Sequence, residues 1–271
     1  MHSNSVGRDS FARYQLAASA GILVLALSLI GAQSSPQSTA PQGQTQSQVP
    51  AAAPQSGQPS PASQTAQVAP PVATPPKLLI MIDPAHGGTE SGAVLNPTIL
   101  EKDITLALAR RLRLDLGTRG FIAELVRDSD VNLSTDDRAA KANAAHPVLY
   151  VCLHATSESG GTGIYTAMLA ENGETNGPFI DWNTAQFSFL PASRTAQHEI
   201  SEAMQKSGMP ARSLSAPLRP LANVTSPALA IELAPTKADV SLLSASDFQQ
   251  NVSTALANGI AQFLSASGAP R

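Results

Sequence analysis

The chain has 271 residues, a formal net charge of −3 and an isoelectric point near 5.9. Lysine and arginine form no dense run that could follow a phosphate backbone, so we expect no nucleic-acid partner. The only cysteine, Cys152, excludes an internal disulfide. Before Lys77 no segment has the apolar periodicity of a packed fold, so the hydrophobic core must come from residues 77–271.

Residues 1–33 have the pattern of an export signal. Arg8 and Arg13 precede an uncharged, mostly apolar stretch at residues 16–32, which is typical of the charged and hydrophobic regions of a secretory signal. The stretch is short for a complete membrane span and ends in small residues at which a signal peptidase could cut. A cleaved signal peptide and a membrane anchor through residues 14–32 are the two alternatives. Both predict export to the periplasm or cell envelope.

Residues 34–76 have the composition of a disordered linker. They contain ten prolines and nine glutamines, with no charged and no aromatic residue. Such a segment has too little apolar surface to offset the entropy of ordering, and frequent proline favours extended polyproline conformations. The linker is either a tether that gives a catalytic domain reach or a simple spacer behind the signal.

Residues 77–271 have the alternating pattern of an α/β domain. Residues 78–82 form an apolar run short enough for a buried strand, which stops at Asp83 and Pro84. Residues 101–118 are expected to form a helix, because aliphatic side chains recur every fourth residue along them. Ser134 is expected to cap a second helix. Further strands are expected at residues 121–126, 147–153, 164–169 and 228–233, and further helices at residues 193–206 and 245–264.

This alternation predicts a single α/β domain with a mostly parallel or mixed central sheet, flanked by helices on both faces. Ligands gather at the strand ends of such sheets. Three of the expected strands end near His86, His154 and Glu232, and Glu101 opens the helix at residues 101–118.

Two histidines and a carboxylate suit a catalytic zinc site, since three protein ligands leave a fourth position for water or substrate. Each residue also has an ordinary structural alternative. His86 could stabilise a tight turn, Glu101 could be a solvated residue at a helix start, and His154 could be a satisfied strand-end histidine. Glu232 lies within an apolar strand, where a carboxylate needs a partner. Taken singly, none of the four residues identifies a site.

Four motifs occur in one order along the chain: Ile-Asp-Pro-Ala-His86-Gly-Gly, Leu-Glu101-Lys-Asp-Ile, Val-Cys-Leu-His154-Ala and Ala-Ile-Glu232-Leu. Together they resemble the zinc-dependent N-acetylmuramoyl-L-alanine amidases. The stretch from Val126 to Asn143 is also similar to that family's segment between its second strand and the following helix. The similarity covers nearly all of residues 77–266.

The resemblance implies one zinc ion held by His86, Glu101 and His154, with Glu232 as the catalytic carboxylate. The implied substrate is peptidoglycan, cleaved at the amide bond between N-acetylmuramic acid and the L-alanine of the stem peptide. An activator protein is a further candidate partner. A zinc peptidase that acts on free wall peptides and a non-catalytic peptidoglycan-binding module are the alternatives.

Three positions depart from the family's usual residues. Ala85 replaces a glycine, which raises the question of whether alanine fits the turn before His86. Thr156 stands where asparagine or aspartate is common. Ala234-Pro235 follows the final Glu-Leu in place of Gly-Phe, and a non-catalytic module is favoured if this change displaces Glu232.

Two further features concern the surroundings of the expected site. Cys152 shares a strand face with His154 and is either a buried small residue or an extra zinc ligand. Residues 171–190, which include Trp182, are least like the family and are expected to form a substrate-facing loop in preference to an autoinhibitory segment that covers the zinc.

Overall fold

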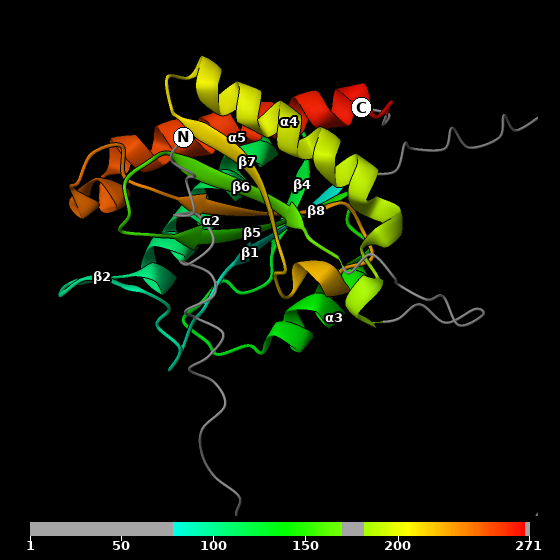
Figure 1. Cartoon of the computed structure of the whole chain (residues 1–271), viewed down its shortest axis with the longest axis horizontal. Helices are drawn as coiled ribbons and strands as arrows, with labels where there is room; N and C mark the ends of the chain where they lie inside the picture. The colour runs from blue at the N-terminus through cyan, green and yellow to red at the C-terminus, as the bar shows by residue number, and fades with distance from the viewer. Residues whose placement is uncertain (1–77, 170–181, 269–271) are drawn as a thin grey trace, which may run out of the picture. The chain divides into compact units, whose positions relative to one another are not determined.

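The computed structural model describes residues 78–169 and 182–268 (Figure 1). The predicted export signal and linker, residues 1–33 and 34–76, lie outside the described residues, as does most of the predicted loop at residues 171–190. Of the helices within the described ranges, none combines the length and the apolar composition that crossing a bilayer requires.

The central sheet has six strands in the order β4-β1-β5-β8-β6-β7. Four adjacent strands run parallel to one another, namely β4 (Ile122–Leu125), β1 (Leu79–Pro84), β5 (Leu149–Ala155) and β8 (Ala228–Leu233). β6 (Thr162–Ala167) runs antiparallel to β8 and parallel to β7 (Ala211–Ala216). The prediction of a mostly parallel, mixed sheet is confirmed.

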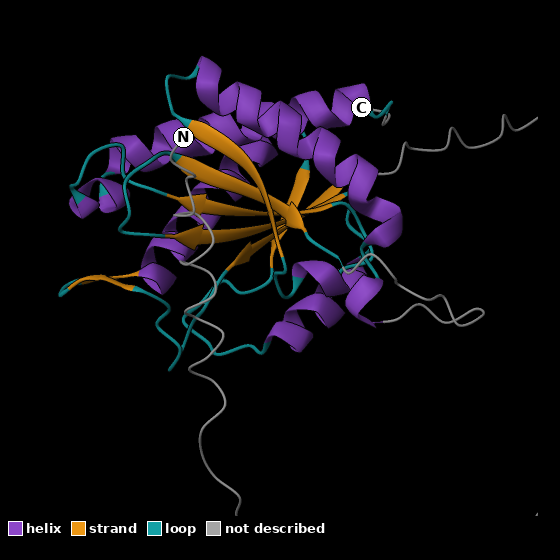
Figure 2. Cartoon of the chain, viewed as in Figure 1, coloured by secondary structure: helices purple, strands orange, loops and turns teal. Residues whose placement is uncertain are grey.

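Helices cover both faces of the sheet, as predicted, but they do so unequally (Figure 2). α2 (Glu101–Thr118), α4 (Leu190–Lys206) and α5 (Ser246–Ala266) pack on one face, and the shorter α3 (Thr135–Ala145) packs on the other. Successive side chains of a strand point to opposite faces. Ile80 and Ile82 therefore join the core beneath the three long helices, whereas Met81 joins the core beside α3.

Most elements lie where the sequence predicts them. α2 has the predicted bounds, and α3 begins directly after Ser134, whose hydroxyl accepts a hydrogen bond from the Asp137 amide (3.1 Å). α4 begins at Leu190, three residues earlier than predicted. Four short 3₁₀ helices complete the described elements: η2 (Trp182–Thr184), η3 (Phe187–Phe189), η4 (Leu221–Asn223) and η5 (Val240–Ser244).

Two features were not predicted. A small antiparallel hairpin of β2 (Val94–Asn96) and β3 (Ile99–Leu100) precedes α2, and β7 forms one edge of the sheet. Both escape detection because the hairpin strands are very short and because β7 has no fully buried residue. An edge strand that buries so little lacks the apolar signal by which strands are recognised.

Candidate functional site

The four predicted site residues meet where the parallel strands end. His86 follows β1, His154 lies near the end of β5, and Glu232 lies near the end of β8, directly paired with His154 in the sheet register. Glu101, the first residue of α2, contacts both histidines. All four line one open pocket at this edge of the sheet. Strand ends are where ligands bind in open α/β sheets, so the location fits a functional site.

Glu101 is held by backbone amides. Its side chain is only 2% exposed, the Ala93 amide donates to Oε2 (2.8 Å) and the Ala155 amide donates to Oε1 (3.2 Å). The Glu101 amide in turn donates to the Ala93 carbonyl (3.0 Å), so the chain leaves at Ala93, forms the β2–β3 hairpin and returns at Glu101. The hairpin that the sequence did not reveal therefore helps to orient this carboxylate.

Both histidines lie against the Glu101 carboxylate. His154 Nδ1 is 2.8 Å from Oε1, and His86 Nε2 is 3.2 Å from Oε2. The two imidazole rings meet edge to face, with centroids 5.4 Å apart. One candidate ligand atom from each of the three residues lies within 4.8 Å of the others. Two imidazoles and one carboxylate are the donor set of a catalytic zinc site with an open position, so the residues present fit this metal.

The ionisation states of the cluster also suit a cation. Burial raises the pKa of Glu101, but the hydrogen bonds with His154 and His86 outweigh burial and hold it well below its usual range. Burial lowers the pKa of His86, but Glu101 and then Glu90 raise it above the ordinary value. The ionised Glu101 carboxylate gives the cluster a negative charge, which favours a cation.

The turn that carries His86 has an unusual backbone. His86 itself has a φ of +63°, and Gly87 and Gly88 follow with φ of +134° and +60°. Ala85 has no positive φ, so the structure answers the question raised by this departure: alanine causes no strain here, because the left-handed residue is His86. A histidine in this conformation needs support from its surroundings.

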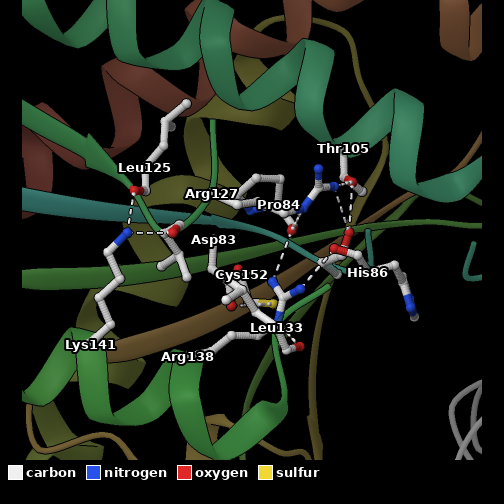
Figure 3. A network of polar contacts seen from close by, with 12 residues as sticks. Asp83, Pro84, His86, Thr105, Leu125, Arg127, Leu133, Arg138, Lys141 and Cys152 are labelled. Atoms are coloured by element: carbon white, nitrogen blue, oxygen red, sulfur yellow. Dashed lines mark hydrogen bonds and ion pairs between the residues drawn. The ribbon is translucent and has the colours of Figure 1, made fainter. Parts of the chain in front are cut away.

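Two arginines supply that support (Figure 3). Arg138 donates to the Pro84 carbonyl (3.0 Å) and the His86 carbonyl (2.7 Å), and it pairs with the Asp83 carboxylate. Arg127 donates to the carbonyls of Pro84 (2.9 Å) and Ala85 (3.1 Å). All three carbonyls of the turn are thus held by fixed cations, which locks the direction in which His86 leaves the sheet. We call Arg127 and Arg138 the arginine brace.

Arg138 of the arginine brace forms an ion pair with a buried carboxylate, Asp83. Asp83 is fully buried and accepts hydrogen bonds from both Arg138 and the Tyr150 hydroxyl. A buried carboxylate is tolerated only when it is paired and hydrogen-bonded, and this one has a cation and a hydroxyl. The Asp83–Arg138 ion pair therefore connects the end of β1 to α3.

Glu232 lies beside the cluster without joining it. Its side chain is 6% exposed, and Oε2 accepts a hydrogen bond from the Tyr165 hydroxyl (2.9 Å). Burial raises the pKa of Glu232 above its usual value, although the Tyr165 hydrogen bond opposes this effect. A carboxylate of raised basicity next to a metal cluster has the properties of a general base.

The remaining departures leave the cluster intact. Glu232 keeps its register with His154, and Ala234 and Pro235 are buried just beyond β8, so this change does not displace the carboxylate. The Thr156 hydroxyl accepts a hydrogen bond from the Glu158 amide (3.2 Å). Cys152 is fully buried, with its sulfur 3.5 Å from His154 Nε2, and burial raises the pKa of its thiol. The candidate metal cluster among the described residues does not include it.

Sequence reasoning assigned no role to the arginine brace, Tyr165 or Glu90. Glu90 Oε1 lies 2.9 Å from His86 Nδ1, and its side chain is mostly exposed. Arginines occur commonly on helices and loops, and a tyrosine in a strand is ordinary core material. Nothing in the local pattern separates such residues from their neighbours, because their partners are distant in sequence.

The fold and the site define an α/β protein that carries a His-Glu-His cluster suited to a metal ion. The sequence profile of the N-acetylmuramoyl-L-alanine amidases matches residues 80–262, and the chain belongs to this family.

Individual relatives agree with this assignment. An endolysin of Bacillus phage SPP1 is 33% identical over 190 residues, which cover 69% of this chain and 66% of the endolysin. The N-acetylmuramoyl-L-alanine amidase AmiC of Neisseria meningitidis serogroup B is 36% identical over 102 residues, covering 36% of this chain and 24% of AmiC. The matched region thus spans no more than about two thirds of these relatives.

A solved structure shows the same fold. The catalytic domain of CwlV, an N-acetylmuramoyl-L-alanine amidase from Bacillus (Paenibacillus) polymyxa var. colistinus, has a TM-score of 0.55 and 24% identity. The alignment covers 69% of this chain and 98% of that domain.

Proposed function

We propose that the protein is a zinc-dependent N-acetylmuramoyl-L-alanine amidase. It hydrolyses the amide bond between N-acetylmuramic acid and the L-alanine of the peptidoglycan stem peptide. The observation that carries the proposal is the cluster of His86, Glu101 and His154 with Glu232 beside it in one pocket, in a chain that belongs to this family. The site of action follows from the substrate: the protein works in the periplasm or cell envelope, after export through its N-terminal segment.

His86, Glu101 and His154 hold the metal, and the arginine brace fixes the turn that presents His86. When bound, zinc supplies a Lewis acid for the amide carbonyl and lowers the pKa of a coordinated water towards about 7. Glu232 accepts a proton from the attacking water and returns it to the departing amine of L-alanine. The raised pKa of Glu232 suits both halves of this cycle, because the group must take up a proton and release it again.

Digestion of purified peptidoglycan by the zinc-loaded protein tests the proposal. Mass analysis should find released stem peptides with a free N-terminal L-alanine and glycan strands that keep the lactyl group. Glu232→Ala should bind zinc normally and release no stem peptides. Cleavage within the peptide would indicate a zinc peptidase instead. Binding to peptidoglycan without cleavage by the native protein would indicate a non-catalytic module.

Zinc content tests the ligand assignment separately. His86→Ala and His154→Ala should each lose most of the bound zinc after dialysis. His198→Ala is the matched control, because His198 lies on the exposed surface of α4 and pairs with Glu202. Equal zinc content in all three variants would contradict the assignment. An activator protein stays a prediction.

A further inference from the structure

The strand next to Glu232 carries a tyrosine that the proposed mechanism does not use. β6 runs antiparallel to β8, and in this pairing Gly163 lies opposite Glu232 while Tyr165 lies opposite Ala230. Tyr165 and Glu232 are therefore not direct cross-strand partners but diagonal neighbours. Gly163 and Tyr165 share one strand face, since they are two residues apart.

The Tyr165 side chain leans along its own strand over Gly163. A β-carbon placed on Gly163 would lie 2.5 Å from Tyr165 Cε2 and 3.0 Å from the Tyr165 hydroxyl oxygen. The ring thus occupies the space in which a side chain at position 163 would stand. Because Gly163 is opposite Glu232, this direction brings the Tyr165 hydroxyl to Glu232 Oε2 at 2.9 Å. Both side chains are nearly buried, at 3% and 6% exposure.

We propose that Tyr165 is a positioning residue for the Glu232 carboxylate, and that Gly163 is required because only a residue without a side chain leaves room for the tyrosine ring. This inference rests on the proposed function, in which Glu232 is the proton-transferring group. Tyr165 engages Oε2 and holds the carboxylate plane, so Oε1 is the oxygen that receives the proton from water.

The ionisation of both groups supports this division of roles. Burial, and then the charge of Glu232, raise the pKa of Tyr165, so its hydroxyl stays protonated and remains a donor. A hydrogen bond from a neutral donor stabilises the ionised form of a buried carboxylate. Tyr165 therefore keeps Glu232 ready to accept a proton in a pocket where burial alone would favour its neutral form.

Steady-state kinetics on a soluble peptidoglycan fragment test the inference. Tyr165→Phe removes only the hydroxyl and should lower kcat by roughly 10–100-fold, the range expected for losing a hydrogen bond to a charged group. KM should change by less than about threefold, because the lost hydrogen bond orients the proton-transferring carboxylate, which acts in the chemical step. Bound zinc and the thermal unfolding midpoint are measured on the same sample to separate positioning from loss of the fold.

Gly163→Ala provides an independent way to break the same contact. Its backbone conformation accepts alanine, since Gly163 has no positive φ, but the new methyl group displaces the ring. Its kcat should fall to a level similar to that of Tyr165→Phe. In the double variant, adding Gly163→Ala to Tyr165→Phe should lower kcat much less than it does in the native protein, because the hydroxyl contact is already absent.

Thr166→Val is the matched control on the same strand. Thr166 lies next to Tyr165 but faces the other side of the sheet, and its hydroxyl pairs with Ser215 on β7 (2.9 Å). The Thr166→Val variant loses a buried hydroxyl, as Tyr165→Phe does, but its kcat should stay at the native level.

The outcomes separate this inference from the proposed function. Native turnover with an unchanged kcat in Tyr165→Phe would overturn the inference and leave the amidase assignment standing. A kcat loss that parallels zinc loss or unfolding, or fully additive effects of the two substitutions, would also overturn it. Absence of turnover in the zinc-loaded native protein would overturn the proposed function and this inference with it.

Discussion

On the face of the sheet beneath α2, α4 and α5, every residue that β1, β5 and β8 contribute to the core is aliphatic. On the opposite face, the same strands carry Asp83, Tyr150, Cys152, His154 and Glu232. The first face stabilises the domain through burial, which is non-directional and tolerates adjustment. The second face holds groups by directional hydrogen bonds and charge pairs. The alternation of side chains thus places aliphatic packing on one face of the sheet and the groups of the candidate site on the other.

The largest effect is expected where the polar face holds a buried charge. Arg138→Met leaves Asp83 buried without its cation and removes one hydrogen bond from each of two carbonyls of the His86 turn, those of Pro84 and His86. Loss of one partner of a buried pair costs about 3–5 kcal/mol, and loss of support for a metal ligand weakens metal binding by roughly 10–100-fold. Urea denaturation and zinc titration measure the two effects.

Arg110→Met is the control for this prediction, because Arg110 pairs with Asp128 on the surface, where both side chains are half exposed. An exposed pair contributes about 0–1 kcal/mol. Adding Asp83→Asn to Arg138→Met should recover part of the lost stability, since no unpaired charge then remains. If Arg138→Met were as stable as Arg110→Met, the structural role of the brace would be refuted.

A smaller effect, confined to stability, is expected from the aliphatic face. Leu112 lies on α2, fully buried against the core beneath the three long helices. Leu112→Ala should lower the free energy of unfolding by about 2–5 kcal/mol, while the activity per folded molecule stays unchanged. Leu114→Ala on the same helix is the control, because Leu114 is 66% exposed and its truncation should cost under about 0.5 kcal/mol. A kcat change in folded Leu112→Ala would break the separation between the two faces.

The smallest effect concerns the start of α3. The Ser134 hydroxyl accepts from the Asp137 amide, and α3 carries Arg138 to the brace. Ser134→Ala should cost about 0.5–2 kcal/mol, whereas Ser134→Thr keeps the oxygen and should cost less. Thermal unfolding followed by circular dichroism compares the two variants. Equal stability of both variants and the native protein would show that the cap contributes nothing.

Helices and strands could be predicted from the sequence only where they bury enough apolar side chains to leave a pattern. α2 and β8 were predicted with their observed bounds because their apolar residues recur with a clear spacing. β7 and the β2–β3 hairpin were missed, because strands that bury little leave no apolar pattern. The hairpin nevertheless matters, since it delivers the Ala93 amide to Glu101.

Only four residues of the candidate site could be predicted from the sequence. His86, Glu101, His154 and Glu232 could be selected from their places at strand and helix ends and from their match to the amidase family. The groups that orient them could not. Tyr165 is 67 positions from Glu232, and Arg127 is 43 positions from the Pro84 carbonyl that it binds. Contacts between residues so far apart leave no local pattern.

Apolar spacing along the chain was therefore sufficient to establish an α/β domain, since periodicity is a local property that each helix or strand must satisfy alone. The polar motifs were sufficient to nominate a metal cluster and a carboxylate. The arginine brace, the amides that hold Glu101 and the Tyr165 contact arose only when folding brought distant parts of the chain together. Directional bonds depend on the positions of both partners, and those positions exist only in the folded chain.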